Sequence, residues 1–491
     1  MTGQRAGTNG RMAAILWLIV AGLAVASALI VNGRPLFYFD TVGYVDQGRV
    51  ALQQLGLEAP TGAGGAGPVA QQAADAVRTV DGSRSPFYSL LAGIFAHLQM
   101  VEMLLVFNAL VLGAALWLTG RVLQRLYAPD SRLAPLVAIP VLAACLGALP
   151  FYAAYLMPDL LAPVMLLMIA LLTAFGRDMT RGELALAFVI ASVCIVSHLS
   201  HFAIGAALVP FAALLSRMGG RRRWMIAPLI LVAVVAVAWG QQKAFRLMAA
   251  KAAHSEVVIK PFITARLIQD GPGYVWLKDH CPDTAVPTCA LWDALQLSKD
   301  PYRLTASHIV FETSKRLGSF RLMSEADQKA VADAQVGFFK DVLRDMPVAV
   351  TVAFVSNTLL QSAMVSVDMT LPTEQIAVRN AGVTGTLGGP LALGRLSEDR
   401  STWLGPVVRM QKTYYAAALV MAMALLLSRG LPQGLRIFGM MILLGIMANA
   451  FVCGGISQPA TRYGARVIWL VPFLAAILLH WTMQRPAEER G

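Results

Sequence analysis

Long apolar runs alternate with short polar segments along most of the chain. The first run extends from about Met12 to Val31 without a charged residue, and a helix of this length can cross a hydrocarbon core of about 30 Å. No convincing small-residue cleavage site follows it, and the apolar region of a cleaved signal peptide usually has only about 7–15 residues. The pattern therefore predicts a retained membrane anchor.

The same pattern predicts ten membrane-spanning helices in all. They lie near residues 12–31, 100–120, 133–150, 157–175, 184–200, 202–216, 225–245, 408–428, 437–454 and 465–482. A further apolar segment, residues 347–366, is ambiguous, because counting it as a span would invert every later loop. We interpret it as an interfacial or domain helix, since Asn357 and Gln361 interrupt it and charged residues precede it.

Composition and charge support this class of protein. Hydrophobic residues make up 57% of the 491 positions, charged residues only 14%, and mean hydropathy is +0.61, outside the ordinary soluble range. The formal net charge of +12 would suggest nucleic-acid binding in a soluble chain, but here the arginines flank apolar spans on one side. They are Arg5, Arg11, Arg121, Arg125, Arg132, Arg177, Arg181, Arg217, Arg221, Arg222, Arg223, Arg429, Arg436, Arg485 and Arg490.

The positive-inside rule places these arginine-rich loops, and both termini, in the cytoplasm. Residues 247–405 hold 15 Lys and Arg against 16 Asp and Glu, so this long segment is nearly neutral and is predicted to lie outside. We therefore expect a multi-pass protein of the inner, cytoplasmic membrane whose partners include the lipid bilayer and no nucleic acid.

The predicted fold is an all-α polytopic membrane protein with three parts. Residues 1–246 form an N-terminal transmembrane module with an external loop at 32–99, residues 247–405 form a mostly helical extracytoplasmic domain, and residues 406–491 form a C-terminal transmembrane module. Within the external loop, residues 57–82 are rich in Ala, Gly, Gln and Pro and are predicted to be mobile.

The five cysteines divide into two groups. Cys145, Cys194 and Cys453 lie in apolar spans, where a thiol is usually a small core hydrophobe. Cys281 and Cys289 lie in the external segment, separated by a short loop with two prolines, and we predict that they form a disulfide. A metal site there would need more ligands nearby than the adjacent histidine provides.

The first external loop begins with two acids close to the predicted membrane exit. Asp40 and Asp46 are six residues apart, and in a helix Tyr44 would share a face with Asp40. Solvation of an ordinary loop is one explanation. Acids this close to a bilayer are costly unless they are paired or functional, however, and Arg34, Arg49 and Arg84 are candidate partners.

Other polar residues are predicted at the same membrane surface. Arg84 precedes Ser-Pro-Phe-Tyr88, where the proline suits the first turn of a surface helix and the arginine could hold an anion. Asp159 starts the fourth span, where it could cap a helix or join a site. His198 and His201 follow the next span and could bind a divalent metal together with a nearby acid, although ordinary loop histidines are commoner.

The last external turn carries Arg462, Tyr463 and Arg466 immediately before the final span. Arginines four residues apart at the outer surface run against the positive-inside trend. They are candidates for binding a lipid phosphate, because a guanidinium group matches phosphate oxygens bidentately. The alternative is that both side chains simply extend along the interface.

Together these motifs resemble the GT-C superfamily of membrane glycosyltransferases, which includes protein mannosyltransferases and aminoarabinose transferases and uses polyprenyl-phosphate sugar donors. The resemblance covers residues 33–175 and 455–480 as a series of short motifs, and residues 247–405 carry none of them. Asp40-Thr41 stands where many members have paired acids, or an acid followed by a small residue and tyrosine.

The resemblance implies an inverting sugar transfer to an extracytoplasmic lipid, glycan or protein acceptor. Asp40 matches the essential acid of the first external loop, with Asp46 as the alternative. Arg84, Arg462 and Arg466 would hold the donor phosphate, and Tyr44, Tyr88, Asp159, His198 and Tyr463 would support the site. No cofactor is assigned, and a divalent metal stays an open alternative.

Two other functions fit a polytopic membrane protein. A transporter or flippase of a lipid-linked envelope intermediate would place polar groups at the membrane midplane, often in two pseudo-repeated halves. The predicted spans have few charges at their centres, and the polar set gathers at one membrane surface, which favours surface chemistry. A noncatalytic protein of envelope-polysaccharide assembly would make the acids dispensable.

Overall fold

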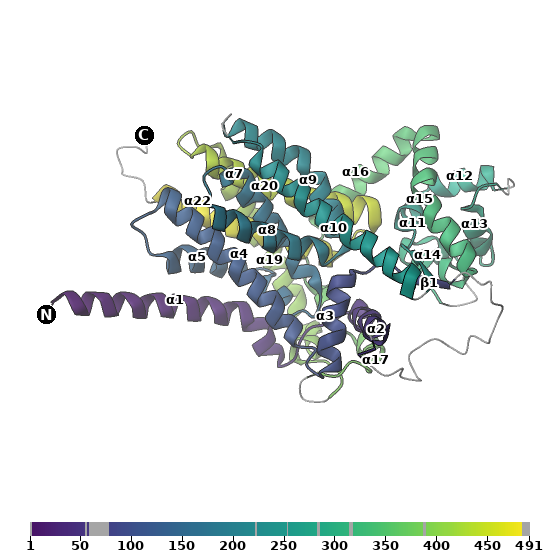
Figure 1. Ribbon diagram of the computed structural model, residues 1–491, viewed down its shortest axis with the longest axis horizontal. Coiled ribbons are helices and arrows are strands. Elements are labelled where there is room, and N and C mark those ends of the chain that lie inside the picture. The colour runs from purple at the N-terminus through teal and green to yellow at the C-terminus, as the bar shows by residue number, and fades with distance from the viewer. Residues whose placement is uncertain are drawn as a thin grey trace.

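The computed structural model describes residues 2–54, 56–57, 78–220, 223–252, 254–281, 285–313, 318–385 and 389–483. These ranges are almost entirely helical, and their only two strands, β1 (Arg78–Asp81) and β2 (Ser255–Val258), pair in parallel. Figure 1 shows a bundle of long helices with a smaller group of short helices at one end. An all-α polytopic architecture is therefore supported.

The helices of the bundle coincide with all ten predicted spans. They are α1 (Thr2–Asn32), α4 (Met103–Tyr127), α5 (Leu133–Cys145), α7 (Leu161–Phe175), α8 (Arg181–Val196), α9 (Leu199–Met218), α10 (Ile226–Ala252), α19 (Arg400–Leu427), α20 (Gln433–Ala450) and α22 (Leu470–Met483). Within the described ranges, eight helical stretches are long and apolar enough to cross a membrane. With 13 and 16 residues, α5 and α8 fall below that length.

The bundle is organised around α7, whose residues are buried along its whole length. It packs against α4, α8, α9 and α20. The helix is apolar on every face, and each face is covered by a neighbouring helix. By contrast, α1 lies at the edge of the bundle and keeps most of its apolar side chains exposed, as a lipid-facing helix does (Figure 1).

Short elements close the end of the bundle that lies away from the chain termini (Figure 1). They are α2 (Phe39–Gln54), α3 (Pro86–His97), α6 (Leu149–Ala153), the 3₁₀ turn η1 (Pro158–Leu160), the π-helix η5 (Phe451–Ser457) and α21 (Thr461–Ile468). Two glycines let α2 and α3 pack closely: a Cβ on Gly48 would lie 1.9 Å from the Ser89 carbonyl oxygen, and one on Gly93 would lie 2.5 Å from the Gly48 carbonyl carbon. Ser85 caps α3, and Pro86 occupies its first turn as predicted.

The predicted extracytoplasmic domain divides into two parts. A separate hydrophobic core, which includes Leu267, Leu291 and Val331, joins β2 to the helices that follow it. These helices are α11 (Phe262–Asp270), α12 (Pro272–His280), α13 (Cys289–Gln296), η2 (Pro301–Leu304), α14 (Ala306–Phe311), η3 (Phe320–Leu322) and α15 (Glu325–Asp345). The described residues between Val367 and Leu391 instead join the core of the bundle, through side chains such as Ile376 and Val383. They contain η4 (Asp368–Thr370) and α17 (Glu374–Arg379), and α18 (Arg395–Glu398) follows.

Two further predictions concern residues 57–82 and residues 347–366. Most of the segment 57–82 that we predicted to be a mobile loop, residues 58–77, lies outside the described residues. Its end is not loop, because residues 78–81 form β1. The ambiguous apolar segment 347–366 forms α16 (Pro347–Ala363), which meets α15 at an angle of 114° and packs against η5.

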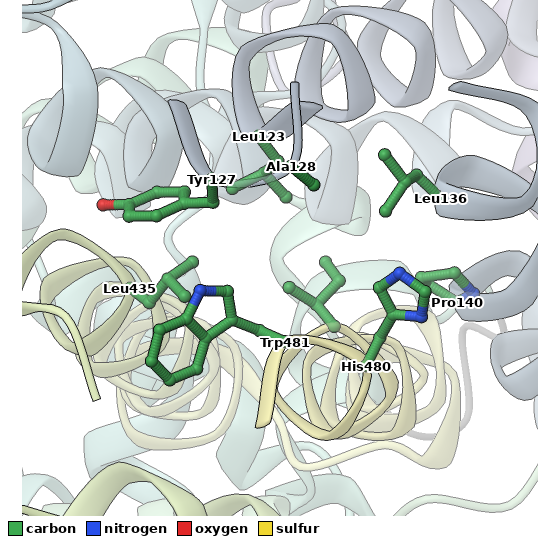
Figure 2. A pocket seen from close by; sticks show the side chains of 9 residues that line it. Leu123, Tyr127, Ala128, Leu136, Pro140, Leu435, His480 and Trp481 are labelled. Atoms are coloured by element: carbon green, nitrogen blue, oxygen red, sulfur yellow. The ribbon is translucent and has the colours of Figure 1, made fainter. Parts of the chain in front are cut away.

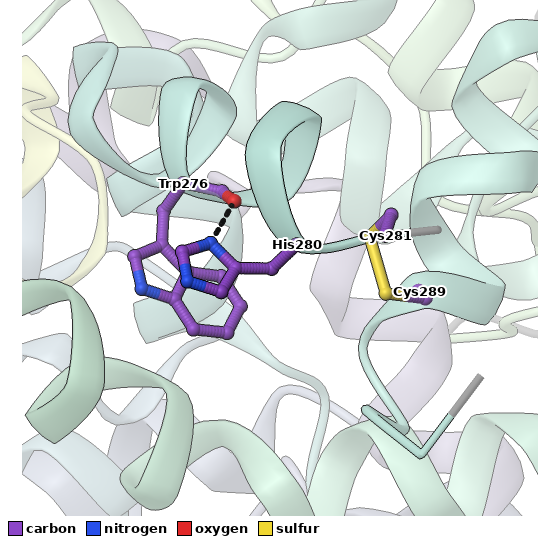
Figure 3. Close-up of a disulfide and its surroundings, with 4 residues drawn as sticks. All are labelled: Trp276, His280, Cys281 and Cys289. Atoms are coloured by element: carbon purple, nitrogen blue, oxygen red, sulfur yellow. Dashed lines mark hydrogen bonds between the residues drawn. A yellow bond between two sulfur atoms is a disulfide. The ribbon is translucent and has the colours of Figure 1, made fainter. Parts of the chain in front are cut away.

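Cys281 and Cys289 form the disulfide that their spacing predicts, with Cα atoms 5.1 Å apart (Figure 3). It links the end of α12 to the start of α13. The adjacent His280 stacks on Trp276 with ring centroids 4.0 Å apart, and its Nδ1 lies 2.8 Å from the Trp276 carbonyl oxygen (Figure 3). The histidine beside the cysteines is therefore held by stacking.

Candidate functional site

Backbone pairing brings the first external segment to the start of α7. The Leu36 N–H donates to the Ala154 carbonyl at 2.8 Å, and the Leu156 N–H donates to the Leu36 carbonyl at 2.8 Å. Residue 40 follows in the first turn of α2, and residue 159 follows in η1. The two acids that the sequence placed in separate loops therefore lie in one region.

Asp40 lies between two arginines from distant parts of the chain. Its Oδ1 accepts from Nη2 of Arg84 at 3.2 Å, and its Oδ2 accepts from Nη1 of Arg462 at 3.2 Å. The first turn of a helix is a favourable place for a carboxylate, because the free N–H groups there carry partial positive charge. A single acid is thus shared by two cations from the first and last segments that the sequence predicts to be external.

Asp159 lies on the far side of Arg462. Its Oδ1 is 3.3 Å from Nη1 of Arg466 and 3.8 Å from Nε of Arg462. Arg466 also donates to Asn449 Oδ1 at 2.8 Å and to Ser200 Oγ at 3.2 Å. The carboxylate of Asp159 therefore pairs with the two arginines, whereas capping was the alternative that the sequence left open.

Together with one further acid and one lysine, these residues form a continuous line of alternating charges, which we call the charge chain. Asp81, at the end of β1, pairs with Arg84 at 3.1 Å and with Lys260, which follows β2. In order, the charge chain consists of Lys260, Asp81, Arg84, Asp40, Arg462, Asp159 and Arg466. Four cations against three acids leave one positive charge in excess, which favours an anionic ligand.

Access to solvent falls from the Asp40 part of the charge chain toward Arg466. The side chain of Asp40 is 32% exposed and that of Arg84 is 21% exposed, whereas Arg462 keeps only 4%. Asp159 and Arg466 are fully buried. An incoming ligand would therefore meet Asp40 and Arg84 first, and Arg466 acts from behind by holding Asp159.

Three atoms of the charge chain keep unused hydrogen-bonding capacity. Nε of Arg84, Nε of Arg462 and Oδ2 of Asp159 are buried and have no hydrogen-bond partner among the residues that the structure describes. Buried polar atoms are nearly always satisfied in folded proteins, so unsatisfied ones call for an explanation such as a bound ligand or water. Two of these atoms are guanidinium donors, which suit an anion.

Aromatic side chains fix the orientation of Arg462. Its guanidinium carbon lies 4.7 Å from the ring centroid of Tyr38 and 4.9 Å from that of Tyr463. The Tyr152 hydroxyl donates to the Arg462 carbonyl at 2.5 Å. A guanidinium between two aromatic faces loses little hydrogen-bonding capacity, because its N–H groups point outward in the plane.

Two amides from later in the chain fasten the elements that carry the charge chain. Asn380, just after α17, accepts from the Val42 N–H at 2.9 Å and donates to the Tyr38 carbonyl at 3.0 Å, which holds the start of α2. Gln361 in α16 bonds to both the N–H and the carbonyl of Ala460, the residue before α21. The segments that present Asp40 and Arg462 are therefore fixed from opposite sides.

Neighbouring positive charges keep the side chains of Asp40 and Asp81 ionised. Burial acts to raise the pKa of Asp40, but the positive charges of Arg462 and Arg84 outweigh it and hold that pKa below its ordinary value. Burial also acts to raise the pKa of Asp81. The positive charges of Lys260 and Arg84 outweigh this effect, so the pKa of Asp81 is likewise lowered. At neutral pH both carboxylates are hydrogen-bond acceptors.

The structure does not bring Asp46 into the charge chain. Asp46 is exposed on α2, and it forms no ion pair with any residue in the described ranges. Tyr44 lies behind the site, buried with its ring 5.3 Å from that of Tyr88 in an edge-to-face contact. Tyr88 in turn accepts from Asn108 at 3.3 Å, so both tyrosines support the packing of α2 on α3.

The two histidines lie beside the charge chain without forming a metal centre. Their ring centroids are 5.2 Å apart, His198 Nδ1 accepts from the Ser200 N–H at 3.1 Å, and His201 Nδ1 is 2.8 Å from the Cys194 carbonyl oxygen. In the part of the chain that the structure describes, no group of three or more His, Cys, Asp or Glu side chains is placed to hold a metal ion.

A small cavity lies at the opposite end of the bundle. Its volume is about 40 Å³, and its lining includes Tyr127, Leu435 and Trp481 near the ends of α4 and α22 and the start of α20 (Figure 2). Most of the side chains around it are apolar, and the space is smaller than a sugar. This cavity plays no part in the candidate site.

Several residues of the site escaped the sequence analysis. Asp81, Lys260 and Asn380 lie in segments without a recognisable motif, and only the fold places them next to Arg84 and α2. Asn449 did carry a signal, because an amide inside a predicted apolar span is costly unless it has a partner. Tyr38, two residues before Asp40, had no role assigned from the sequence.

Comparison with known proteins adds no assignment: no family model, no curated protein and no solved structure matches this chain. The function must therefore be argued from the charge chain and its position in the fold.

Proposed function

We propose that this protein is a membrane glycosyltransferase of the GT-C type, which moves a sugar from a polyprenyl-phosphate donor to an extracytoplasmic acceptor. One observation carries the proposal: the partly exposed carboxylate of Asp40 lies between Arg84 and Arg462 at the end of the helical bundle. Such a site offers a proton acceptor and two phosphate-binding groups in direct contact, and this is what sugar transfer from a lipid phosphate requires.

The reaction is a single displacement at the anomeric carbon. The acceptor hydroxyl gives its proton to Asp40, its oxygen forms the new bond to the anomeric carbon, and the bond from that carbon to the phosphate oxygen breaks. Polyprenyl phosphate leaves with the electron pair and gains a negative charge. Arginines that face this oxygen stabilise the growing charge, and the anomeric configuration inverts.

The ion pairs of Asp40 suggest how the site is activated. A carboxylate held by two arginines is a weak base, because their charges lower its pKa. A donor phosphate that binds Arg84 and Arg462 would replace the carboxylate as their partner. Asp40 would then regain basicity next to the acceptor, so that donor binding prepares the base.

The buried end of the charge chain has a positioning role in this scheme. Arg466 is too enclosed to reach a ligand directly, and it holds Asp159, which lies 3.8 Å from Nε of Arg462. The sequence placed Arg466 on the donor phosphate, and its burial favours a role behind the phosphate-binding groups instead.

The test compares two substitutions of the same chemistry on one helix. Asp40→Asn and Asp46→Asn are expressed separately, their membrane levels are matched, and glycan modification of the envelope is assayed in the native host. We expect Asp40→Asn to lose about 10²-fold activity or more, the usual contribution of a general base, and Asp46→Asn to stay near wild type. Full activity in both variants contradicts the proposal.

A second measurement separates transfer from transport. Purified protein in proteoliposomes is given the polyprenyl-phosphate-sugar fraction of the host, with the matching acceptor fraction, and released polyprenyl phosphate is measured by mass spectrometry. A transferase consumes the donor and releases polyprenyl phosphate, whereas a flippase moves the donor across the bilayer intact. Movement without release would replace the enzyme with the transporter.

A further inference from the structure

The outer surface of α16 is mostly apolar, and its exposed polar residues are the small hydroxyl side chains Thr351 and Ser356. We define the outer face of α16 by five exposed side chains: Val348, Val352, Val355, Leu359 and Leu360, which are 74%, 59%, 54%, 60% and 53% exposed. The first four are spaced four, three and four residues apart, which places them along one side of the helix. No residue of α16 is charged. Apolar patches of this kind on a protein surface mark interaction sites.

The two amides that interrupt this segment in the sequence do not reach its outer face. Asn357 donates to Asp270 Oδ2 at 2.8 Å, and Gln361 bonds to Ala460 on the opposite side of the helix. The hydroxyl of Thr358 donates to the carbonyl of Phe354 within the helix at 2.7 Å. The polar groups that argued against contact with hydrocarbon therefore have protein partners.

The outer face of α16 is continuous with the exposed surface of a candidate membrane span. The helical stretch Gln433–Ser457 is one of the candidate spans, and α16 packs against its end with almost no gap: a Cβ on Gly454 would lie 2.4 Å from Cβ of Gln361. Phe354 of α16 contacts Phe451 of that span edge to face, with centroids 6.4 Å apart, and Phe451 is itself exposed. Figure 1 shows α16 beside the end of the bundle.

We propose that the outer face of α16 is embedded in the bilayer, where it contacts lipid acyl chains as a re-entrant arm attached to the membrane-spanning bundle. Water cannot be the neighbour of this face without a large apolar cost, at about 25 cal/mol per Å². The neighbouring arm, α15, carries Lys329, Asp333, Lys340 and Arg344 and is suited to water. The sharp break of 114° between the two helices then marks the level at which the chain enters the membrane.

This placement also gives the candidate site a lipid-facing wall. Gln361 ties α16 to the residue before α21, and α21 carries Arg462 two residues further on. Lipid that contacts α16 would therefore lie one helix away from the charge chain. The proposal concerns the surface alone and holds whether or not the protein transfers a sugar.

The test uses a fluorescent bimane label at single introduced cysteines in proteoliposomes. The background carries Cys145→Ala, because the other free thiols, Cys194 and Cys453, are buried. The labelled variants are Val352→Cys and Leu359→Cys on α16, with Val336→Cys on α15 as the control, since Val336 is exposed to a similar degree, 53%. The quenchers are lipids brominated on their acyl chains and aqueous iodide.

We expect brominated lipid to quench the labels at 352 and 359 strongly and iodide to quench them little, with the reverse at 336. Strong iodide quenching at 352 and 359, equal to that at 336, would show that the face is in water and would overturn the proposal. Quenching by neither agent would mean that protein, such as a second copy of this chain, covers the face, and this also overturns it.

Discussion

At the level of single residues, two arginines four positions apart have different environments and different roles. Arg462 is held between two aromatic rings and faces the partly exposed Asp40, whereas Arg466 is sealed between Asp159, Asn449 and Ser200. Breaking a buried ion pair by removing one partner is costly, because the other charge stays behind unpaired. Changes at Arg466 should thus act first on stability and changes at Arg462 first on ligand binding.

A small substitution next to the site tests the importance of the Arg84–Asp40 pair. In Gly43→Ala the new methyl group would lie 2.4 Å from the guanidinium carbon of Arg84, so the arginine must move away from Asp40. We expect weaker binding of the lipid-phosphate donor with little loss of thermal stability, since the displaced group is the end of a flexible side chain. Donor affinity in detergent and the melting temperature are the measurements. Gly22→Ala, with nothing within 4 Å of the added methyl group, is the control.

The lowered pKa of Asp40 predicts how stability depends on pH. Its carboxylate stabilises the folded state fully above the unfolded-state pKa, near 3.8, and this contribution is lost as pH falls through the lower folded-state pKa. In detergent, the melting temperature of the wild type should therefore fall more steeply than that of Asp40→Asn between about pH 4 and pH 2. Parallel curves would show that the two ion pairs of Asp40 do not favour its charged form.

At the level of elements, close helix packing and long-range clamps position the charge chain. The contact of α2 with α3 depends on Gly48 and Gly93, and it sets the separation of Asp40, on α2, from Arg84, just before α3. Asn380 fixes the first turn of α2 from a segment more than 300 residues later. The relative positions of Asp40 and Arg84 therefore depend on these contacts.

Gly48→Ala tests the α2–α3 contact. The added methyl group would meet the backbone of α3 at 1.9 Å, and backbone cannot move aside as a flexible side chain can. We expect a loss of stability of about 1–3 kcal/mol or more, as for other overpacked interfaces, together with reduced activity. Thermal unfolding in detergent measures this loss. Gly337→Ala on α15 has open space around it and should be neutral or slightly stabilising, by up to about 1 kcal/mol.

At the level of the whole molecule, α2 and α3, which present Asp40 and Arg84, lie away from the chain termini, toward the end where α12 and α13 carry the disulfide (Figure 1). The loops next to the termini carry the arginines on which the predicted orientation rests. The disulfide points in the same direction, because disulfides persist outside the cytoplasm. Both signals predict that the candidate site lies on the outer side of the membrane.

Thiol labelling in intact cells tests this orientation. In a Cys145→Ala background, Cys289→Ser leaves Cys281, the half-buried member of the pair, as a free thiol, and we expect a membrane-impermeant maleimide to label it without permeabilisation. Asp130→Cys, in the exposed loop between α4 and α5, should be labelled only after permeabilisation. The opposite labelling pattern would invert the map and move the charge chain to the cytoplasmic side.

The sequence alone predicted much of the helical framework. Uninterrupted apolar runs must form helices in a membrane because backbone groups have no water there, so all ten predicted segments are helical. The described residues between Val367 and Leu391 were harder to place. Their apolar residues could enter either hydrophobic core, and the sequence assigned them to the external domain, whereas they pack with the bundle.

What the sequence determined is the helical, membrane-spanning class of this protein, the approximate positions of its long apolar helices, the cysteine pair and most of the polar residues that gather at one end of the bundle. Only the tertiary structure decided which carboxylate pairs with which arginine or lysine. Asp40 and Arg462 are 422 residues apart, and no local pattern can encode such a contact. The sequence favoured Asp40 and kept Asp46 as the alternative; the two acids lie on different faces of α2, and only Asp40 pairs with arginines among the described residues. The difference between Asp40 and Asp46 therefore follows from how α2 packs against its neighbours.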